Sequence, residues 1–441
     1  MFLLTILIKA AKAGKRTLKR IVKGGSRKSH LSVTRRIERV KLSRRVVAMT
    51  FDDGPCLLPA NPDHFGERAL TDVILDIMKE YGARGTFDVV GDTSANYPDT
   101  CGKDGTPAWG GVKFDHYPDF GKDSFGGAVN CPEQIERILA EGHELSNHGY
   151  LHRLMGRQRF VYGARECHRD FQAVTEDLLR LHRLIEEKYG VSMTLSRPPH
   201  YVDRINDALT SYDAYTATGY QYMAASFDGA GWLPSAAGYE EEVRLMSAPL
   251  AAALERDPDA LSGQIIFQKD GYNMAHRSPV ADGLRDQLEL LKKYGYEVVP
   301  VSELLALCEV SDIGPEETVY PAILRCLRAG RPVLFDDNSF RAAKPVTRGE
   351  LAMFLSGGEL ARERVERLCG GERGKVFSDL PLAHPYSLAA KAAVESGRLA
   401  LRDGKFAPDE QVTAAELRAA FGRDVGTSRA EIVTVVAEEL V

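Results

Sequence analysis

The sequence predicts an α/β protein with a parallel sheet, followed by a small all-α domain. Between residues 46 and 301, seven short apolar runs are separated by stretches with helical spacing. This alternation is typical of a parallel sheet connected by helices. Beyond residue 308 the alternation stops and the chain repeats itself, as small helical units do. Spacing alone leaves open whether the sheet is doubly wound or closed into a barrel.

The predicted elements follow one another in a regular order. Apolar, β-branched runs predict strands at 46–51, 86–90, 143–147, 193–197, 222–227, 264–268 and 297–301. Apolar residues at helical spacing predict helices at Ala69–Tyr81, Pro132–Glu141, Val161–Lys188, Tyr239–Arg256 and Val280–Tyr294. A functional site is expected at the sheet edge where such strands end.

Charge is distributed unevenly along the chain. Positions 9–45 hold fifteen Lys or Arg residues against Glu38 alone, which leaves 42 basic and 61 acidic residues elsewhere. The basic segment 1–45 begins with an apolar run too short to span a membrane. It is interpreted either as an amphipathic helix on an anionic membrane surface or as a disordered tail. Nucleic-acid binding is not expected, because the body is acidic and no nucleic-acid-binding motif accompanies the tail.

The most informative motif is Thr-Phe-Asp-Asp-Gly-Pro at residues 50–55, directly after an apolar run. Neighbouring residues on a strand point to opposite faces, so Asp52 and Asp53 are hard to explain as packing. One of them can hold a metal while the other handles a proton. The alternative is a strand-terminal turn with two solvated acids.

A pair of histidines gives the metal interpretation its other ligands. His148 and His152 are four residues apart, a spacing that places both imidazoles on one face of a helical turn. Together with a carboxylate at a strand end they supply the three protein ligands of an open hydrolytic site. Two imidazoles and a carboxylate most naturally select zinc among divalent cations.

Further blocks follow in order: Arg197-Pro-Pro-His-Tyr201, Asp228-Gly-Ala-Gly-Trp232 and Gly263 to Asp270. The ordered set resembles the polysaccharide deacetylases of carbohydrate esterase family 4, the NodB-homology domain. The resemblance covers residues 46–308 and implies a distorted (β/α)7 barrel. It also implies metal-dependent hydrolysis of N-acetyl or O-acetyl groups on a cell-wall polysaccharide such as peptidoglycan.

The resemblance assigns a role to each matching residue. Asp53, His148 and His152 are the metal ligands, Asp52 is the general base, and Arg197 keeps Asp52 ionised and oriented. The resemblance also implies that four other residues of these motifs contact the oxyanion or the substrate: His200, Tyr201, Asp228 and Trp232. The expected partner is an acetylated polysaccharide.

The sequence departs from the family pattern at the group that protonates the leaving amine. Lys269 stands where the family has a histidine acid, and Gly231 replaces an aspartate. Lys269 can serve as the acid if its pKa is lowered beside a dication, and His200 or His276 are other candidates. The alternative is a catalytically weak or inactive protein that binds cell-wall glycan without cleaving it.

The last part of the chain, 309–441, repeats a Gly-Arg to Phe stretch followed by a Thr-Arg-x-Glu box. These repeats resemble S-layer homology repeats, which implies binding to cell-wall polymer, often through the box arginine. Arg348 and Arg429 occupy that position in the first and third copies, whereas the middle copy has Ala414. The expected location is the cell surface or the cell wall, although no export signal is recognisable.

Overall fold

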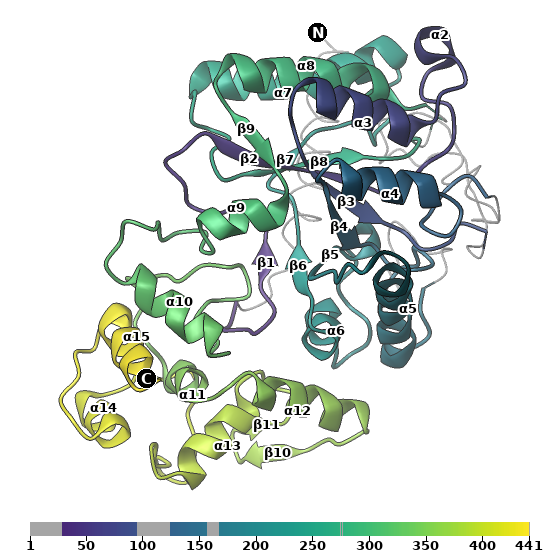
Figure 1. The fold of residues 1–441 in the computed structure, drawn as a ribbon. Helices are drawn as coiled ribbons and strands as arrows, with labels where there is room; N and C mark the ends of the chain where they lie inside the picture. Colours follow the sequence, from purple (N-terminus) through teal and green to yellow (C-terminus); the bar gives the residue numbers. More distant parts are fainter. Residues whose placement is uncertain (1–28, 95–123, 157–166, 274, 276, 441) are drawn as a thin grey trace, which may run out of the picture. The chain divides into compact units, whose positions relative to one another are not determined.

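The computed structural model describes residues 29–94, 124–156, 167–273, 275 and 277–440, which form two compact units (Figure 1). The first unit comprises residues 42–205 and 223–306. The second comprises the described residues of 28–41, 206–222 and 307–441. The predicted membrane-binding residues 1–28 and the candidate acid His276 lie outside the described residues. The domain bounds predicted from the sequence, 1–45, 46–308 and 309–441, stay predictions.

A parallel half-barrel of strands forms the centre of the first unit, which confirms the predicted fold class. Its strand order is β5-β4-β3-β2-β8-β7, with β9 also paired to β2. The strands are β2 (Val46–Asp52), β3 (Thr86–Val89), β4 (Glu144–Asn147), β5 (Leu195–Ser196), β7 (Phe227–Asp228), β8 (Ile265–Lys269) and β9 (Glu297–Val299). Every residue of β2 is buried. This explains its continuous apolar run, since a central strand of a parallel sheet is covered on both faces.

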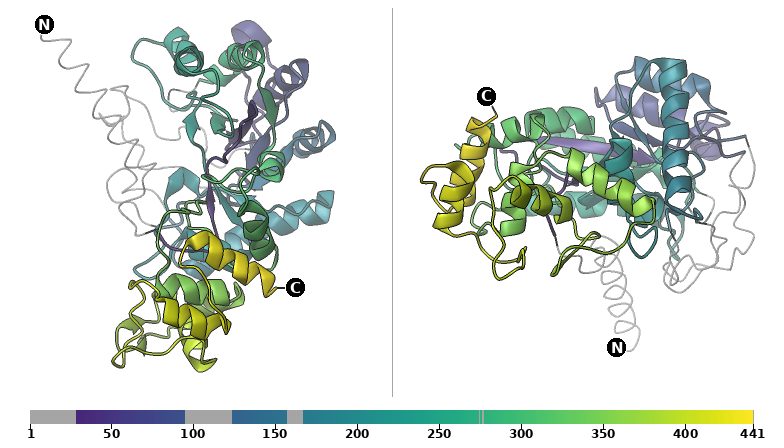
Figure 2. Two further views of the ribbon diagram at one scale, coloured as in Figure 1. Left: turned by 90° about the vertical axis from the view of Figure 1, so that its left-hand side faces the viewer. Right: turned by 90° about the horizontal axis from the view of Figure 1, so that it is seen from below.

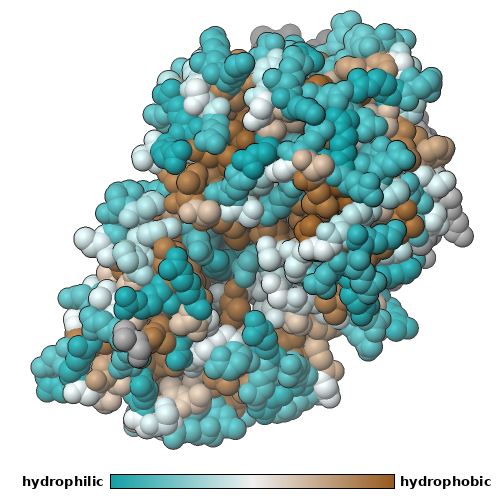
Figure 3. Space-filling view, in the orientation of Figure 1, coloured by the Kyte–Doolittle hydropathy of each residue, from teal (hydrophilic) through white to brown (hydrophobic). Residues whose placement is uncertain are grey.

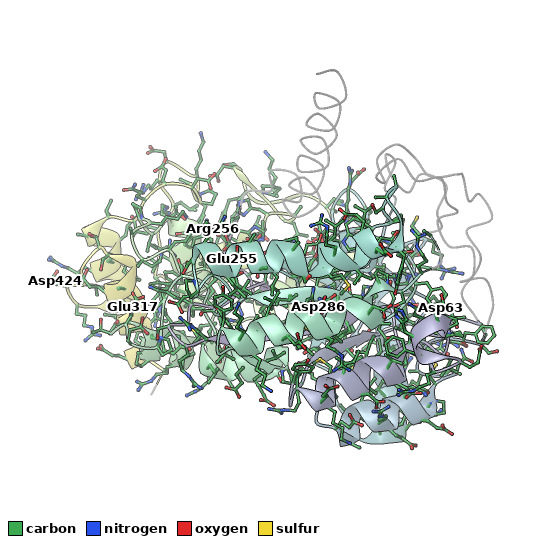
Figure 4. The ribbon with its side chains drawn as sticks, turned by 90° about the horizontal axis from the view of Figure 1, so that it is seen from above. Asp63, Glu255, Arg256, Asp286, Glu317 and Asp424 are labelled. Carbon is green, nitrogen blue, oxygen red and sulfur yellow. The ribbon has the colours of Figure 1, made fainter. Side chains whose placement is uncertain are left out.

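Helices cover the outside of this sheet (Figure 2). They are α2 (Pro62–Phe65), α3 (Leu70–Glu80), α4 (Pro132–Ala140), α5 (Phe171–Tyr189), α7 (Tyr239–Arg256), α8 (Pro279–Lys293) and α9 (Val301–Leu307). Helix α8 packs against both α7 and α3. Hydrophilic side chains cover much of the visible surface, with apolar ones between them (Figure 3). Asp63, Glu255 and Asp286 are exposed examples of the acidic body (Figure 4).

Two element predictions differ from the structure. The single strand expected at 222–227 is two strands, β6 (Gln221–Met223) and β7, because the Ser226 hydroxyl takes the place of a backbone acceptor for the Ile265 N–H at 3.1 Å. Helix α5 begins at Phe171, where the Asp170 carboxylate caps the Ala173 N–H at 2.9 Å. Residues 161–166 of the longer helix that was expected lie outside the described residues.

The second unit is largely helical, as predicted. Its helices are α6 (Ser211–Thr218), α10 (Tyr320–Arg328), α11 (Arg348–Leu355), α12 (Glu359–Cys369), α13 (Ser387–Glu395), α14 (Ala414–Phe421) and α15 (Arg429–Glu438). The short strands β1 (Arg36–Ile37) and β6 are neighbours, and β10 (Lys375–Phe377) and β11 (Leu380–Pro381) form an antiparallel pair. Within the described residues, no helix is both long and apolar enough to cross a membrane.

Candidate metal centre and active site

The register of the sheet gathers the ionisable residues at one edge. Asp52, the last residue of β2, lies opposite Asp88 on β3 and opposite Lys269 on β8. All three strands run parallel, so their carboxyl ends meet here. Asp53 follows directly, with a positive φ of 78°, and its N–H donates to the Asp88 carbonyl at 3.3 Å. These ionisable residues therefore gather at the end of β2, the strand edge at which the sequence predicts a site.

The three predicted metal ligands converge. Asp53 Oδ1 lies 3.1 Å from His148 Nε2 and 2.9 Å from His152 Nε2. One potential ligand atom from each residue lies within 4.8 Å of those of the other two. His148 Nδ1 faces the Arg197 carbonyl at 2.9 Å, so this nitrogen carries the proton and Nε2 is left to bind a cation. A carboxylate and two correctly turned imidazoles fit a divalent metal.

The local backbone around the histidines is not the helical turn predicted from their spacing. Residues 148–152 form a loop, with positive φ values at Gly149 and His152. The buried Asp177 carboxylate holds this loop by accepting the N–H groups of Tyr150 at 2.7 Å and Leu151 at 3.1 Å. The loop, rather than a helix, brings His148 and His152 together, with ring centroids 4.9 Å apart.

Asp52 forms a buried pair with Arg197, as the sequence predicted. The Arg197 guanidinium contacts Asp52 Oδ1 and lies 3.1 Å from the Thr50 hydroxyl. Arg197 is 1 % exposed and Asp52 is 4 % exposed. Burial raises the pKa of Asp52 to about 7, against the opposing effect of Arg197 and His148. A carboxylate with a pKa near neutrality is suited to general base catalysis at that pH.

Lys269 is buried and contacts the metal ligand Asp53 through Oδ2. Burial alone would raise the pKa of Asp53, but Lys269 and the two histidines together hold it well below its usual value. Asp53 Oδ1 still faces both imidazoles, so the contact with Lys269 leaves one carboxylate oxygen for a cation. This ion pair is a tertiary contact that the sequence did not predict.

The predicted substrate residues fall into two groups. His200 and Tyr201 lie in the short turn Pro199–Tyr201, where the His200 ring is 5.1 Å from that of His152 and Tyr201 faces the Arg197 guanidinium at 5.7 Å. Asp228 and Trp232 form a separate pair after β7, one strand beyond Lys269, in which Trp232 Nε1 donates to Asp228 at 3.1 Å. The first group therefore adjoins the metal ligands.

Gly231 has a backbone conformation that favours glycine. Its φ is +82°, and a Cβ there would lie 2.8 Å from Val280 Cγ2. A residue with a side chain would be strained in this conformation and would displace Val280. The turn between Asp228 and Trp232 is thus built for glycine.

Comparison with known proteins finds one family model and two relatives. Residues 39–223 match the family model for polysaccharide deacetylase. The chain is 29% identical over 174 residues to the peptidoglycan-N-acetylmuramic acid deacetylase PdaC of Bacillus subtilis, covering 40% of this chain and 25% of that protein. It is 26% identical over 265 residues to the peptidoglycan-N-acetylglucosamine deacetylase of Bacillus cereus, covering 60% of this chain and 89% of that protein. The chain thus spans about a quarter of the length of the Bacillus subtilis relative.

Among solved structures, that of PdaC from Bacillus subtilis matches with 23% identity and a TM-score of 0.38, covering 60% of this chain and 93% of that one. The family model and the two relatives support a polysaccharide deacetylase domain in this chain. The predicted enzyme class, a hydrolase of the polysaccharide deacetylase type, is consistent with these similarities.

Proposed function

We propose that the first unit is a zinc-dependent deacetylase that removes N-acetyl groups from a cell-wall polysaccharide, with peptidoglycan as the leading substrate. One observation carries the proposal: the buried Asp52–Arg197 pair and the Asp53, His148 and His152 set meet at one strand end. The names of both relatives support peptidoglycan as the substrate. O-acetyl groups, whose hydrolysis would release a sugar hydroxyl instead of an amine, are the alternative substrate, and the cell wall is the proposed location.

A divalent cation bound by Asp53, His148 and His152 would polarise the acetyl carbonyl and make a nearby water more acidic. Asp52 takes the proton from the attacking water, while the buried Arg197 guanidinium fixes the orientation of the carboxylate. The backbone N–H of His200 is proposed to donate to the oxyanion. Trp232 and Asp228 are proposed to contact the substrate at the end of β7, the strand next to the one that carries Lys269.

The proton for the leaving amine is proposed to come from Lys269, whose ammonium already lies at the metal ligand Asp53. His200 is the other described candidate, because its ring adjoins His152. Transfer of a proton to the amine releases the sugar amine and acetate.

A second candidate function rests on the same contact. In the ion pair with Asp53, the Lys269 ammonium is held at a carboxylate and is less available to protonate the leaving amine. This contact favours a protein that binds acetylated glycan without hydrolysing it. Acetate release from acetylated chitooligosaccharides and peptidoglycan by the zinc-loaded chain separates the two functions. Activity that disappears in Asp52→Ala supports the deacetylase. If the unsubstituted chain releases no acetate but the Lys269→His variant does, the result supports a protein that binds glycan without cleaving it.

The second unit is proposed to consist of S-layer-homology-like repeats that bind cell-wall polymer. Helices α11, α14 and α15 each begin with a capping box, formed by Thr347 and Glu350, Thr413 and Glu416, and Ser428 and Glu431. Next to these boxes is a cavity of about 400 Å³ lined by residues that include Lys344, Gln411, Ser428 and Arg429.

The box arginines of these repeats are buried. Arg348 is fully buried and contacts Glu416 of the next copy, which leaves no exposed guanidinium to meet a polymer. Arg429 is fully buried as well and pairs with Glu350. We therefore propose that the partly exposed Lys344, which lines the cavity, contacts an anionic group of the polymer. Binding of purified cell-wall polymer that is lost in Lys344→Gln but kept in Arg423→Gln would support this role.

An anionic membrane surface remains a proposed partner for the basic N-terminal segment. Its charge carries the proposal, since residues 9–28 hold nine Lys or Arg residues and no acidic one, which matches what anionic headgroups attract. Salt-dependent sedimentation of the full chain with vesicles that contain phosphatidylglycerol, but not with neutral vesicles, tests it.

A further inference from the structure

Asp88 is a buried carboxylate beside the site to which the proposed mechanism gives no task. It lies on β3, which pairs with β2 on one side and β4 on the other. The register places Asp88 opposite Asp52 and opposite Ser146. Its exposure is 0 %. A carboxylate that is fully removed from water is costly unless charged or polar groups compensate for the loss.

The contacts of Asp88 lead to one metal ligand. Its Oδ1 accepts the hydroxyl proton of Ser146. Its Oδ2 lies 2.7 Å from Nδ1 of His148, and within the described residues no donor is directed at that oxygen. The N–H of the same His148 nitrogen points at the Arg197 carbonyl at 2.9 Å. His148 is thus held on its far side by a carbonyl and a carboxylate, while Nε2 faces Asp53.

This arrangement has a consequence for cation binding. A negative group at Nδ1 favours the tautomer that carries its proton there, which leaves the Nε2 lone pair free. The same carboxylate makes the imidazole a stronger ligand, because its negative charge compensates for the electron density that Nε2 donates to a cation. A main-chain bond from the His148 N–H to the Val89 carbonyl, at 2.9 Å, holds the His148 backbone against β3, the strand that carries Asp88.

The net charge of the groups around the site also indicates that Asp88 strengthens cation binding. Around the site stand four buried carboxyl groups, Asp52, Asp53, Asp88 and Asp270, and two basic groups, Arg197 and Lys269. With all carboxyl groups ionised the sum is −2, and without Asp88 it is −1. A dication is held more weakly by the less negative set. Asp88 therefore offsets the positive charge that Lys269 places against Asp53.

We propose that Asp88 is a positioning residue of the metal centre, which orients His148 for binding through Nε2 and sets the affinity for the cation. The proposal rests on the proposed metal-dependent function, but it concerns affinity rather than turnover. Outer partners of metal-binding histidines typically change affinity by about 10- to 100-fold when removed.

The test measures Zn²⁺ affinity of the full chain by competition with a chromophoric chelator. Asp88→Asn keeps the size and an acceptor oxygen but loses the charge, and Asp88→Ala loses both. Glu144→Gln is the matched control, since Glu144 is a mostly buried carboxyl group on the neighbouring strand that accepts from Thr86 at 2.7 Å, away from the ligands. Affinity should fall about 10-fold or more in Asp88→Asn, further in Asp88→Ala, and not in Glu144→Gln.

A second readout separates positioning from folding. The visible absorption spectrum of the Co²⁺-loaded chain should change in both Asp88 variants, and excess Zn²⁺ should restore binding to an Asp88→Asn chain that is folded by circular dichroism. Wild-type affinity and an unchanged Co²⁺ spectrum in both variants would overturn the proposal, as would an unsubstituted chain that binds no metal. A chain whose Zn²⁺ affinity depends on Asp88 but that releases no acetate would overturn only the proposed deacetylase function.

Discussion

Replacing Arg197 with leucine isolates the contribution of one buried cation to the proposed general base. Arg197 contacts Asp52, and both side chains are buried. A cation this close lowers the pKa of a carboxyl group by about 1 to 3 units. Its removal should therefore raise the pKa of Asp52 from about 7 by about 2 units. At pH 7 the ionised fraction then falls from about one half to about one hundredth, a loss of about 50-fold in kcat/KM.

The assay is the pH profile of kcat/KM for acetate release. In Arg197→Leu the acid limb should move to higher pH by about 2 units, so that much of the activity returns near pH 9. Arg364→Leu is the matched control, because it breaks another buried pair, with Asp213. Both variants should lose about 3–5 kcal/mol of stability, since each leaves a buried carboxylate without its partner. An Arg197→Leu chain with an unmoved acid limb would refute the assigned role of the pair.

Three further results are expected. Arg348→Ala should lower the free energy of unfolding by about 2–4 kcal/mol, because it removes a fully buried side chain that donates to the Phe406 and Ala400 carbonyls, whereas exposed Arg418→Ala should have little effect in the same denaturant titration. Burial lowers the pKa of His143 to about 4, below the unfolded value of about 6.5, so the stability it contributes is present above pH 6.5 and lost as pH falls towards 4. His143→Gln should remove up to about 3 kcal/mol of that acid dependence, and equal slopes of unfolding free energy against pH in both chains would contradict it. Chelation of the metal should lower thermal stability, by about 2.7 kcal/mol relative to Zn²⁺ at 100 times its Kd, and an unchanged melting temperature in calorimetry would count against a zinc site.

The fold was predictable because its signals are local. The buried run that forms β2 and the helical spacing of α3, α4, α7 and α8 locate these elements to within a few residues. Parallel pairing then follows from the helical connections, and it brings Asp52 to the edge where the site lies. The split between β6 and β7 was not predictable, since it depends on the Ser226 side chain reaching Ile265 on another strand.

The site was predictable only where a motif marks it. Asp53, His148 and His152 converge as their motifs indicated, but the loop that joins the histidines depends on Asp177, 25 residues downstream of His152. Asp88 belongs to no motif, although a carboxylate within a buried strand was a signal that the sequence offered.

Other contacts are visible only in three dimensions. The ion pair of Lys269 with Asp53 joins residues 216 positions apart, which spacing along the chain does not reveal. Burial of Arg348 is likewise a tertiary effect, because the partner carboxylate, Glu416, comes from another copy of the repeat. Arg429 is equally buried, so the polymer contact predicted for the box arginines passes, as a proposal, to Lys344 beside them.

The central claim is that the residues at the end of β2 form a metal-dependent deacetylase, and metal-dependent acetate release tests it most directly. The full chain is stripped of metal with a chelator, and acetate release from N-acetylated peptidoglycan is measured before and after addition of Zn²⁺, with Asp53→Ala in parallel. Acetate release is expected only after Zn²⁺ is restored, and none is expected from Asp53→Ala. Equal release by the stripped chain, or no release by a chain shown to hold Zn²⁺, would contradict it.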